Sequence, residues 1–452
     1  MNKRILIIFI IIILALFGGG AYWYFTQRTT SKTPVTSFPS GSTSTPSTGT
    51  QGTAVQEEPS SFTPTEGKAL PRLYQLHTAP VAGVGFAETK DKKGNITNIT
   101  ARYIERGLGN IFETQLSNYS ETRLVNETRP HLSEALWGNN GNSVVVRFVD
   151  DVANGIIKSR IVNILPSASS SVQNISGGFL KTEEVYLPDS LPFIALAEDH
   201  TDNLFYLEGE DGLATNFKNL GVSNIFSSVF TEWLPQFPNQ TLITLTSRPS
   251  ANIPGHLFFL NPKTKAVTKI LGSIKGLTTL TSHDGKFVLF SETKDSAPQL
   301  SVYDVAKKIS FSLYVRTLPE KCVWKIKDPT MAYCAVPKTI QKALYPDQWY
   351  QGLISFSDEI WEINTSTFSA HKILSPSSLG APSLDMTNLS ISSDDSYLLF
   401  TSKLTGAPWL YSLIERSPFQ QTVVATTPTS TTSTSTKTVP PSVISPDMQK
   451  LK

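Results

Sequence analysis

The chain has 452 residues, of which 39% are hydrophobic and only 17% are charged, so Ser and Thr supply much of the polar surface. Its 39 basic and 37 acidic side chains give a formal net charge of +2. A chain so evenly charged has no basic field to attract a phosphate backbone, and we expect no nucleic-acid partner. The length would suit about three domains of roughly 150 residues, although one all-β domain can be this large.

An uncharged segment at residues 5–25 is the first strong signal. Its length of about 21 residues, at about 1.5 Å each, spans the roughly 30 Å hydrocarbon layer of a bilayer. Two basic residues precede it, and residues 22–24 are all aromatic, as in an interfacial belt. We predict an uncleaved transmembrane anchor over residues 1–28. The alternative is a cleaved signal peptide, for which residues 18–21 offer small side chains.

Two tracts rich in Ser, Thr and Pro flank the centre of the chain, at residues 29–69 and 416–452. Such tracts have too few large apolar residues to offset the entropy lost on ordering, so we predict a disordered stalk and a disordered tail. Their mucin-like composition fits the outside of a cell. The expected protein is therefore single-pass in the cell membrane, with its C-terminal domain extracytoplasmic.

Residues 70–415 are predicted to form one all-β domain. Apolar clusters such as residues 143–149, 241–246 and 397–400 are short runs of about four to eight residues between turn-forming residues, and helical periodicity is nearly absent. Many short, evenly spaced strands indicate a sandwich, a barrel or a propeller.

One repeated unit favours the propeller. It occurs at residues 281–290 and 391–400, where a turn that contains Asp precedes an apolar strand. Asp bonds its own downstream backbone in such turns, and Gly285 tolerates a positive φ, a position that Asp395 takes in the second copy.

This unit resembles the TolB/WD40-like propeller repeat, whose Ser-Pro-Asp-Gly turn joins the first two strands of a blade. The region from Cys322 to residue 352 also resembles uncharacterised bacterial membrane-anchored propeller proteins, a resemblance that implies no function. At roughly 45 to 50 residues per blade, about 345 residues make about seven blades. We expect residues 72–77 to complete the last blade as its outer strand, or else to form an ordinary first strand.

The chain has two cysteines, Cys322 and Cys334, placed symmetrically about Asp328. In a hairpin that turns at Asp328 they would face each other on antiparallel strands, close enough for a disulfide. We predict this disulfide, which indicates an oxidising compartment. The alternative is a pair of buried free thiols.

No catalytic or metal-binding motif is present, and we predict no cofactor and no metal. The six histidines are scattered singly, and there is no Gly-x-Ser-x-Gly elbow and no phosphate loop after a strand. Adjacent acids at residues 150–151, 183–184 and 358–359 are interpreted as solvated turns, since glycosidases need two carboxylates about 5 to 10 Å apart across a pocket.

The segment at residues 339–352 is longer than a hairpin needs and contains Tyr345, Trp349 and Tyr350. Long loops in compact domains are often functional, and exposed aromatic rings can stack on a sugar or anchor a protein. These three residues form a candidate interaction loop. Alternatively, they plug the propeller channel or cover the edge of a blade.

The architecture and the missing motifs favour a non-enzymatic module that binds a protein or a glycan at the cell envelope. The alternative is a glycan-acting hydrolase or lyase with carboxylates at the propeller channel. Both interpretations depend largely on the fold, which by itself does not determine function.

Overall fold

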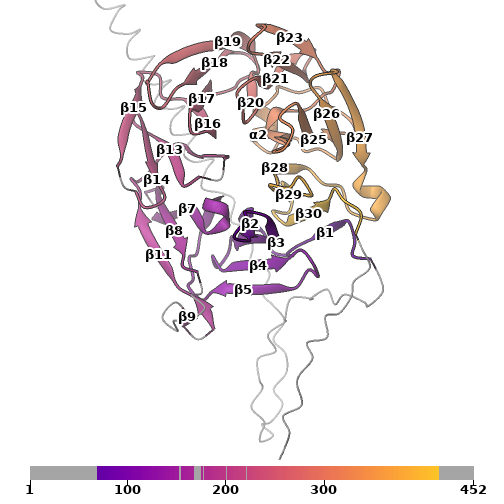
Figure 1. The fold of residues 1–452 in the computed structure, drawn as a ribbon. Helices are drawn as coiled ribbons and strands as arrows, with labels where there is room; N and C mark the ends of the chain where they lie inside the picture. Colours follow the sequence, from indigo (N-terminus) through magenta and orange to yellow (C-terminus); the bar gives the residue numbers. More distant parts are fainter. Residues whose placement is uncertain are drawn as a thin grey trace, which may run out of the picture. The chain divides into compact units, whose positions relative to one another are not determined.

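The short apolar runs form strands that pair with their sequence neighbours in seven four-stranded antiparallel sheets, arranged as the blades of a β-propeller (Figure 1). This computed structural model describes residues 69–151, 154–166, 175–176, 178–199, 201–219 and 221–416. The prediction of an all-β propeller with about seven blades is confirmed. The predicted anchor at residues 5–25, the stalk and nearly all of the tail lie outside the described ranges, and within those ranges no helix is long and apolar enough to cross a membrane.

The first strand of each blade lies nearest the central channel and the fourth lies at the rim (Figure 1). The first four blades are β2 (Val81–Lys90), β3 (Ile96–Glu105), β4 (Ile111–Gln115) and β5 (Glu121–Val125); β6 (Leu132–Gly138), β7 (Ser143–Asp151), β8 (Ile156–Ile164) and β11 (Thr182–Tyr186); β12 (Ile194–Leu196), β13 (Asn203–Glu208), β14 (Asp211–Asn216) and β15 (Ser223–Ser227); and β16 (Trp233–Asn239), β17 (Leu242–Ser247), β18 (Pro254–Leu260) and β19 (Val267–Lys275).

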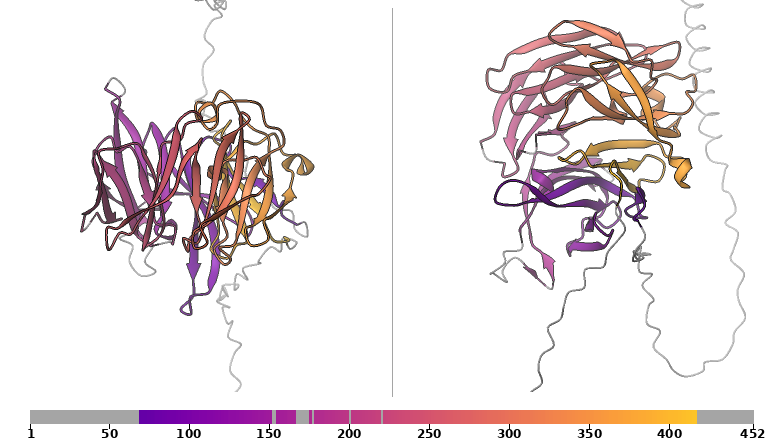
Figure 2. Two further views of the ribbon diagram at one scale, coloured as in Figure 1. Left: turned by 90° about the horizontal axis from the view of Figure 1, so that it is seen from above. Right: turned by 45° about the vertical axis from the view of Figure 1, so that its right-hand side comes forward.

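The remaining blades are β20 (Thr278–Thr281), β21 (Phe287–Lys294), β22 (Ala297–Asp304) and β23 (Ile309–Ser312); β24 (Cys322–Trp324), β25 (Met331–Pro337), β26 (Asp358–Asn364) and β27 (Ser369–Leu374); and β28 (Met386–Ile391), β29 (Tyr397–Ser402), β30 (Pro408–Ser412) and β1 (Leu73–Gln75). A small hairpin of β9 (Ile175–Ser176) and β10 (Phe179–Leu180) forms a separate two-stranded sheet between β8 and β11 in the chain. The described helices are short: η1 (Asn139–Gly141), η3 (Pro319–Lys321), α2 (Asp347–Tyr350) and η4 (Pro376–Leu379). Seen from the side, the strands run roughly along the propeller axis (Figure 2).

The ring closes through the N-terminal strand β1, which is the outer strand of the last blade. Leu73 lies opposite Tyr411 and Gln75 lies opposite Trp409 in an antiparallel pair with β30. The Arg72 side chain strengthens this junction, because its Nε donates to the carbonyl of Ser412 at 3.1 Å. The expectation that residues 72–77 complete the last blade is confirmed. Closure of this kind removes the unpaired edges that an open array of blades would leave at its two ends.

Apolar side chains fill the space between neighbouring blades. Leu289 and Leu300 of the fifth blade, for example, pack with Trp324 and Ala332 of the sixth, and all four are at most 1% exposed. Burial of this kind between consecutive sheets supplies the main stabilisation of the ring.

The two clear copies of the repeated turn have the same hydrogen bonds. In the first copy Ser282 Oγ donates to Asp284 at 2.8 Å and accepts from the Phe287 N–H at 3.0 Å. In the second copy Ser392 makes the equivalent bonds to Asp394 and to Tyr397. Gly285 has a φ of +71° and Asp395 has a φ of +62°, so Asp395 does occupy the glycine position.

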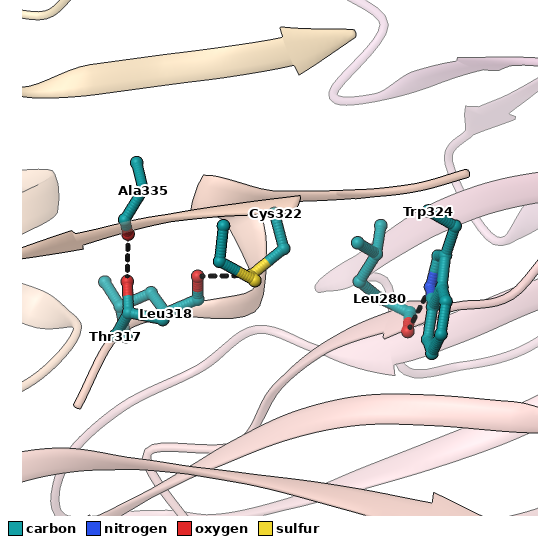
Figure 3. Close-up of a disulfide and its surroundings, with 7 residues drawn as sticks. Leu280, Thr317, Leu318, Cys322, Trp324 and Ala335 are labelled. Carbon is teal, nitrogen blue, oxygen red and sulfur yellow. Dashed lines mark hydrogen bonds between the residues drawn. A yellow bond between two sulfur atoms is a disulfide. The ribbon is translucent and has the colours of Figure 1, made fainter. Parts of the chain in front are cut away.

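The Cys322–Cys334 disulfide joins the first two strands of the sixth blade, as predicted (Figure 3). The two residues lie directly opposite each other in the β24–β25 pair, with their Cα atoms 4.0 Å apart. Next to the disulfide, the Trp324 indole N–H donates to the carbonyl of Leu280 at 3.3 Å, which ties the sixth blade to the fifth.

The pairing of β1 with β30 predicts that Leu73→Ala destabilises the whole propeller. Leu73 is 8% exposed and packs in the core of the last blade, so the loss of its side chain should lower the free energy of unfolding by about 2 kcal/mol. Urea denaturation monitored by circular dichroism measures this difference. The control is Glu415→Ala, which removes a side chain that is 92% exposed and should change stability by less than about 0.5 kcal/mol.

The disulfide closes a loop with a sequence separation of 12 residues, so Cys322→Ala combined with Cys334→Ala should lower the stability by about 3 kcal/mol. Adding a reductant to the unaltered protein should lower its melting temperature to that of the double variant. The same reductant should leave the melting temperature of the double variant unchanged. Equal melting temperatures for the two proteins under oxidising conditions would show that the disulfide contributes nothing.

Candidate functional site

The innermost strands surround a central channel that contains two cavities, of about 250 and 310 Å³. Trp137 and Glu198 line both cavities, His283 and Ser390 line the smaller one, and Asn388 lines the larger one. We call these five residues the channel site. Cavities of this size suit small ligands or the end of a chain.

Trp137 is held in place by two glycines of the neighbouring blade. Its indole N–H donates to the carbonyl of Gly83 at 3.3 Å. A Cβ atom on Gly85 would lie 2.5 Å from the Cβ of Trp137, so no larger residue fits there without displacing the indole. The half-buried ring therefore lies in a fixed position in the channel wall.

Glu198 and His283 form a pair in the wall of the smaller cavity. Both residues come from the turn after the innermost strand of their blade, and His283 Nδ1 lies 3.3 Å from a carboxylate oxygen of Glu198. Burial is the largest influence on the pKa of His283 and lowers it. The hydrogen bond and charge of Glu198, together with the backbone of Trp324, outweigh burial, so the pKa of His283 is raised above its ordinary value of 6.5.

A second acid of the channel, Glu134, is paired with an arginine. Glu134 lines the larger cavity and accepts a hydrogen bond from Arg147 at 2.7 Å. Among the described residues that line the two cavities there is no Lys or Arg. Because Glu134 is paired with Arg147 and Glu198 contacts His283, neither carboxylate of the lining is without a partner.

The innermost strand of the last blade is irregular where it lines the channel. The register of β28 with β29 shifts between Thr387 and Ser390, and Asn388 has a φ of +53°. Asn388 is exposed to the cavity, and Ser390 Oγ is buried with no hydrogen-bond partner among the described residues. A bulge of this kind re-aims a side chain and is common next to functional sites.

The structure places the candidate interaction loop outside these cavities. Tyr345 is 0% exposed and Trp349 is 4% exposed, and the two rings pack in one cluster with Phe356, whereas Tyr350 is 43% exposed. Stacking of Tyr345 or Trp349 on a ligand would need the loop to open, because their rings are covered. Of the three residues, Tyr350 alone presents part of its ring to a partner.

The loop is fastened across neighbouring blades. The Ala251 N–H of the fourth blade donates to Asp347 at 2.7 Å, and the Thr293 hydroxyl of the fifth blade donates to the carbonyl of Tyr345 at 2.6 Å. The loop therefore contacts strand ends and turns of the fourth and fifth blades.

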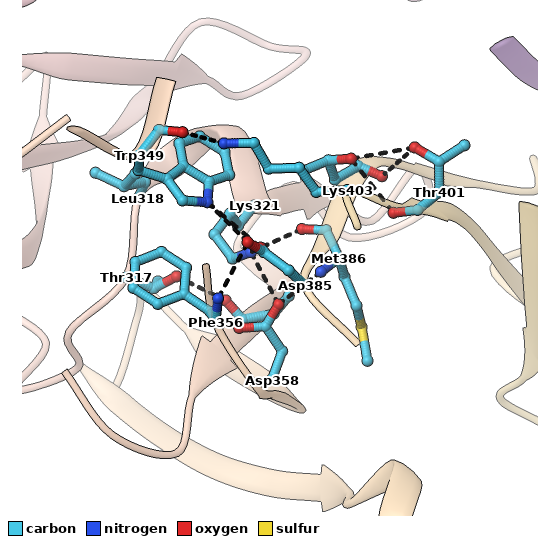
Figure 4. A network of polar contacts seen from close by, with 12 residues as sticks. Thr317, Leu318, Lys321, Trp349, Phe356, Asp358, Asp385, Met386, Thr401 and Lys403 are labelled. Atoms are coloured by element: carbon cyan, nitrogen blue, oxygen red, sulfur yellow. Dashed lines mark hydrogen bonds and ion pairs between the residues drawn. The ribbon is translucent and has the colours of Figure 1, made fainter. Parts of the chain in front are cut away.

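A buried ion cluster below the loop was not predicted from the sequence (Figure 4). The interpretation of residues 358–359 as a solvated turn was wrong, because Asp358 begins the strand β26 and its side chain is buried. The Lys321 ammonium lies 2.8 Å from Asp358 and 2.5 Å from Asp385, and it donates to the carbonyl of Met386 at 2.8 Å. All three charged side chains are 0% exposed. Each stands at or just before the start of a strand of the sixth or seventh blade, at positions far apart in the sequence.

Trp349 connects the loop to this cluster. Its indole N–H donates to Asp385 at 3.0 Å, and the Lys403 ammonium lies 4.0 Å from the centre of its ring. Burial raises the pKa of Asp358 to about 6, although Lys321 acts in the opposite direction. The cluster thus orders the loop at the cost of desolvating charged groups.

No family model matches the sequence, and no curated protein matches it. Two solved oligogalacturonate lyases are similar in structure. One, in complex with manganese, has a TM-score of 0.50 at 10% identity and covers 78% of this chain and 96% of its own. The other, from Vibrio parahaemolyticus, has a TM-score of 0.50 at 10% identity and covers 76% and 94%.

The tricorn protease has a TM-score of 0.46 at 8% identity, over 76% of this chain and 34% of the protease. What these proteins share with the present chain is the propeller fold. Identity this low does not carry over an activity or a ligand. Within the described ranges, no group of three or more His, Cys, Asp or Glu side chains is placed to hold a metal ion.

The Glu198–His283 pair predicts that Glu198→Gln lowers the pKa of His283. The substitution removes the carboxylate charge that raises this pKa, and burial, which lowers it, remains. NMR titration of histidine-labelled protein measures the change, with the His283 signal assigned from a His283→Gln variant. An unchanged titration curve for His283 would show that the pair is not formed in solution.

The raised pKa of Asp358 predicts that the difference in stability between the unaltered protein and Asp358→Asn depends on pH. Between pH 3.8 and about 6 the folded state holds a proton on Asp358 that the unfolded state has released, so this group lowers stability as the pH rises through that window. Asp358→Asn cannot ionise and removes the effect. Relative to the unaltered protein, the stability of the variant should rise by up to about 3 kcal/mol from pH 4 to pH 7. A constant difference across that range in urea denaturation would contradict the account.

Proposed function

We propose that this protein is a non-enzymatic binding module of the cell envelope, which holds a protein or glycan ligand at the channel site. The observation that carries the proposal is the convergence of an aromatic ring and polar groups on one channel. Trp137 lines both cavities, and Asn388 and Ser390 face them from the last blade. Mostly apolar pockets with a few placed polar groups are the usual form of a ligand site.

The pairing of the two channel carboxylates, Glu134 and Glu198, favours binding over catalysis. Glycosidic hydrolysis needs two carboxylates with different protonation states on either side of the scissile bond. In the channel, Glu134 is paired with Arg147 and Glu198 is paired with His283. Both carboxylates are thereby occupied, which supports a site that holds a ligand without cleaving it.

A position outside the cytoplasm is part of the proposal. The predicted anchor at residues 5–25 and the predicted stalk would tether the propeller to the membrane. The Cys322–Cys334 disulfide supports an oxidising compartment. Arg72 and Glu415 lie 3.2 Å apart, so the described chain enters and leaves the propeller at one place.

Membership of the TolB/WD40-like propellers is a further part of the proposal. It is supported by the shared hydrogen bonding of the turns at Ser282 and Ser392, which corresponds to the Ser and Asp positions of the repeat.

A glycan-acting hydrolase or lyase is the second candidate, favoured by the Glu198–His283 pair. An imidazole that is hydrogen-bonded to a carboxylate can act as a general base when its second nitrogen reaches the substrate. The fold similarity to the two oligogalacturonate lyases is compatible with this candidate. The sparse free cationic charge in the channel disfavours an anionic uronate substrate, whose carboxylate needs neutralisation.

The channel proposal predicts that Trp137→Ala abolishes ligand binding. Full-length protein in detergent should bind a subset of glycans or peptides on an array. The variant should lose at least about 10-fold in affinity, because burial of a ligand's apolar face against the indole contributes roughly 1.4 kcal/mol or more. The matched control is Tyr314→Ala, which removes an aromatic ring that is 90% exposed at the rim of the fifth blade and should leave binding unchanged.

The same preparation distinguishes binding from catalysis. It should release no reducing ends and no unsaturated uronate, measured by absorbance at about 235 nm, from envelope polysaccharides. Turnover that disappears in His283→Gln would establish the second candidate and overturn the first.

A further inference from the structure

The bulge in β28 differs from the other irregularities of the innermost strands in its backbone conformation. The register of β28 with β29 shifts between Thr387 and Ser390, and β2, β6 and β16 also shift against their partners. Among the described residues of the innermost strands, Asn388 is the non-Gly residue with a positive φ. Within the bulge, Asn388 adopts a φ of +53°, a left-handed conformation that Asn tolerates better than most residues other than Gly. Backbone outliers of this kind are enriched at functional sites.

The bulge presents two hydrogen-bonding groups to the channel. The Asn388 amide nitrogen has one long contact with the Thr401 hydroxyl, at 3.3 Å, and the side chain is otherwise exposed to the larger cavity. Ser390 Oγ lines the smaller cavity and is buried without a partner among the described residues. A buried hydroxyl without a partner destabilises the protein, and a hydrogen bond to a ligand hydroxyl or a water would offset that cost.

The larger cavity, which Asn388 lines from the seventh blade, has Trp137 in its wall on the second blade. These two blades flank the first blade on either side. Between them, the first blade lines the cavity with the small residues Ala82 and Gly83 and with Val84. The cavity of about 310 Å³ is equivalent to the volume of roughly ten water molecules, which suits one or two sugar rings.

The charge of the lining selects among ligands. Glu134 and Glu198 are paired with Arg147 and His283, and the described lining offers no unpaired cation to an anionic ligand. Burying the carboxylate of an anionic ligand there without a cationic partner would be strongly unfavourable. A ligand with an apolar face, several hydroxyls and no charge fits this lining best.

We propose that the channel site binds a neutral saccharide, whose apolar ring face stacks on Trp137 and whose hydroxyls bond Asn388 and Ser390. This inference rests on the proposed function, because it names the ligand class of the same site. It excludes uronates, in contrast to the substrate in the name of the two lyases of similar fold.

The test is isothermal titration calorimetry of full-length protein in detergent with four probes: maltotetraose, cellotetraose, chitotetraose and the anionic trigalacturonate. At least one neutral tetrasaccharide should bind with one site per chain, and trigalacturonate should not bind. The binding should be retained at 0.5 M salt, because no ion pair to the ligand is involved.

Asn388→Gly tests the bulge directly. Glycine accepts the φ of +53° without strain, so the variant keeps the backbone and removes the amide. Its affinity for the bound neutral saccharide should fall about 3- to 10-fold, and Ser390→Ala should produce a loss of similar size. The matched control is Asn219→Gly, at an Asn with a φ of +52° in the outer turn of the third blade, which should leave the affinity unchanged.

The outcomes separate the inference from the proposed function. If trigalacturonate or a peptide binds in a Trp137-dependent way and no neutral probe binds, the channel is a binding site and the saccharide inference is wrong. If a neutral probe binds and Asn388→Gly has no effect, the role of the bulge is wrong. If neutral saccharides bind but Trp137→Ala does not weaken them, the channel is not the site and both proposals fail.

Discussion

The closing pair between β1 and β30 is the interaction on which the rest of the structure depends. It joins residues at the two ends of the described domain, with Leu73 opposite Tyr411, and it makes the last blade four-stranded. Every blade then packs between two neighbours, and the seven innermost strands enclose one channel. The channel site draws on the second, third, fifth and seventh blades, so its shape exists only when the ring is closed.

Within that ring, departures from regular strand geometry build the polar part of the site. Gly83 and Gly85 allow close approach of the second blade and fix Trp137, and the bulge of β28 aims Asn388 into the channel. The charged residues contribute in a different way. Glu134 is paired with Arg147, Glu198 contacts His283, and the described lining has no Lys or Arg, which is why the proposed ligand is uncharged.

The sequence was most informative about features set by local pattern. Alternating apolar runs and Asp-containing turns predicted the strands and the propeller, and the spacing of Cys322 and Cys334 about a turn predicted their disulfide. The site could not be predicted in this way, because Trp137, His283 and Asn388 come together only across blades. The Lys321 cluster was missed for the same reason. Whether Trp349 contacts a ligand or covers part of a blade could not be decided from the sequence, because Asp385 and Lys403, which contact its indole in the fold, are far from it in the chain.

The central claim is that the ligand lies in the channel and not on the covered loop or the rim. A crystal structure of the protein soaked with the neutral tetrasaccharide that binds in solution tests it most directly. The account predicts density for a sugar ring on Trp137, with hydroxyls within hydrogen-bond distance of Asn388 and Ser390. Density beside Tyr350 or at the rim of the blades, with the channel free of sugar, would contradict it.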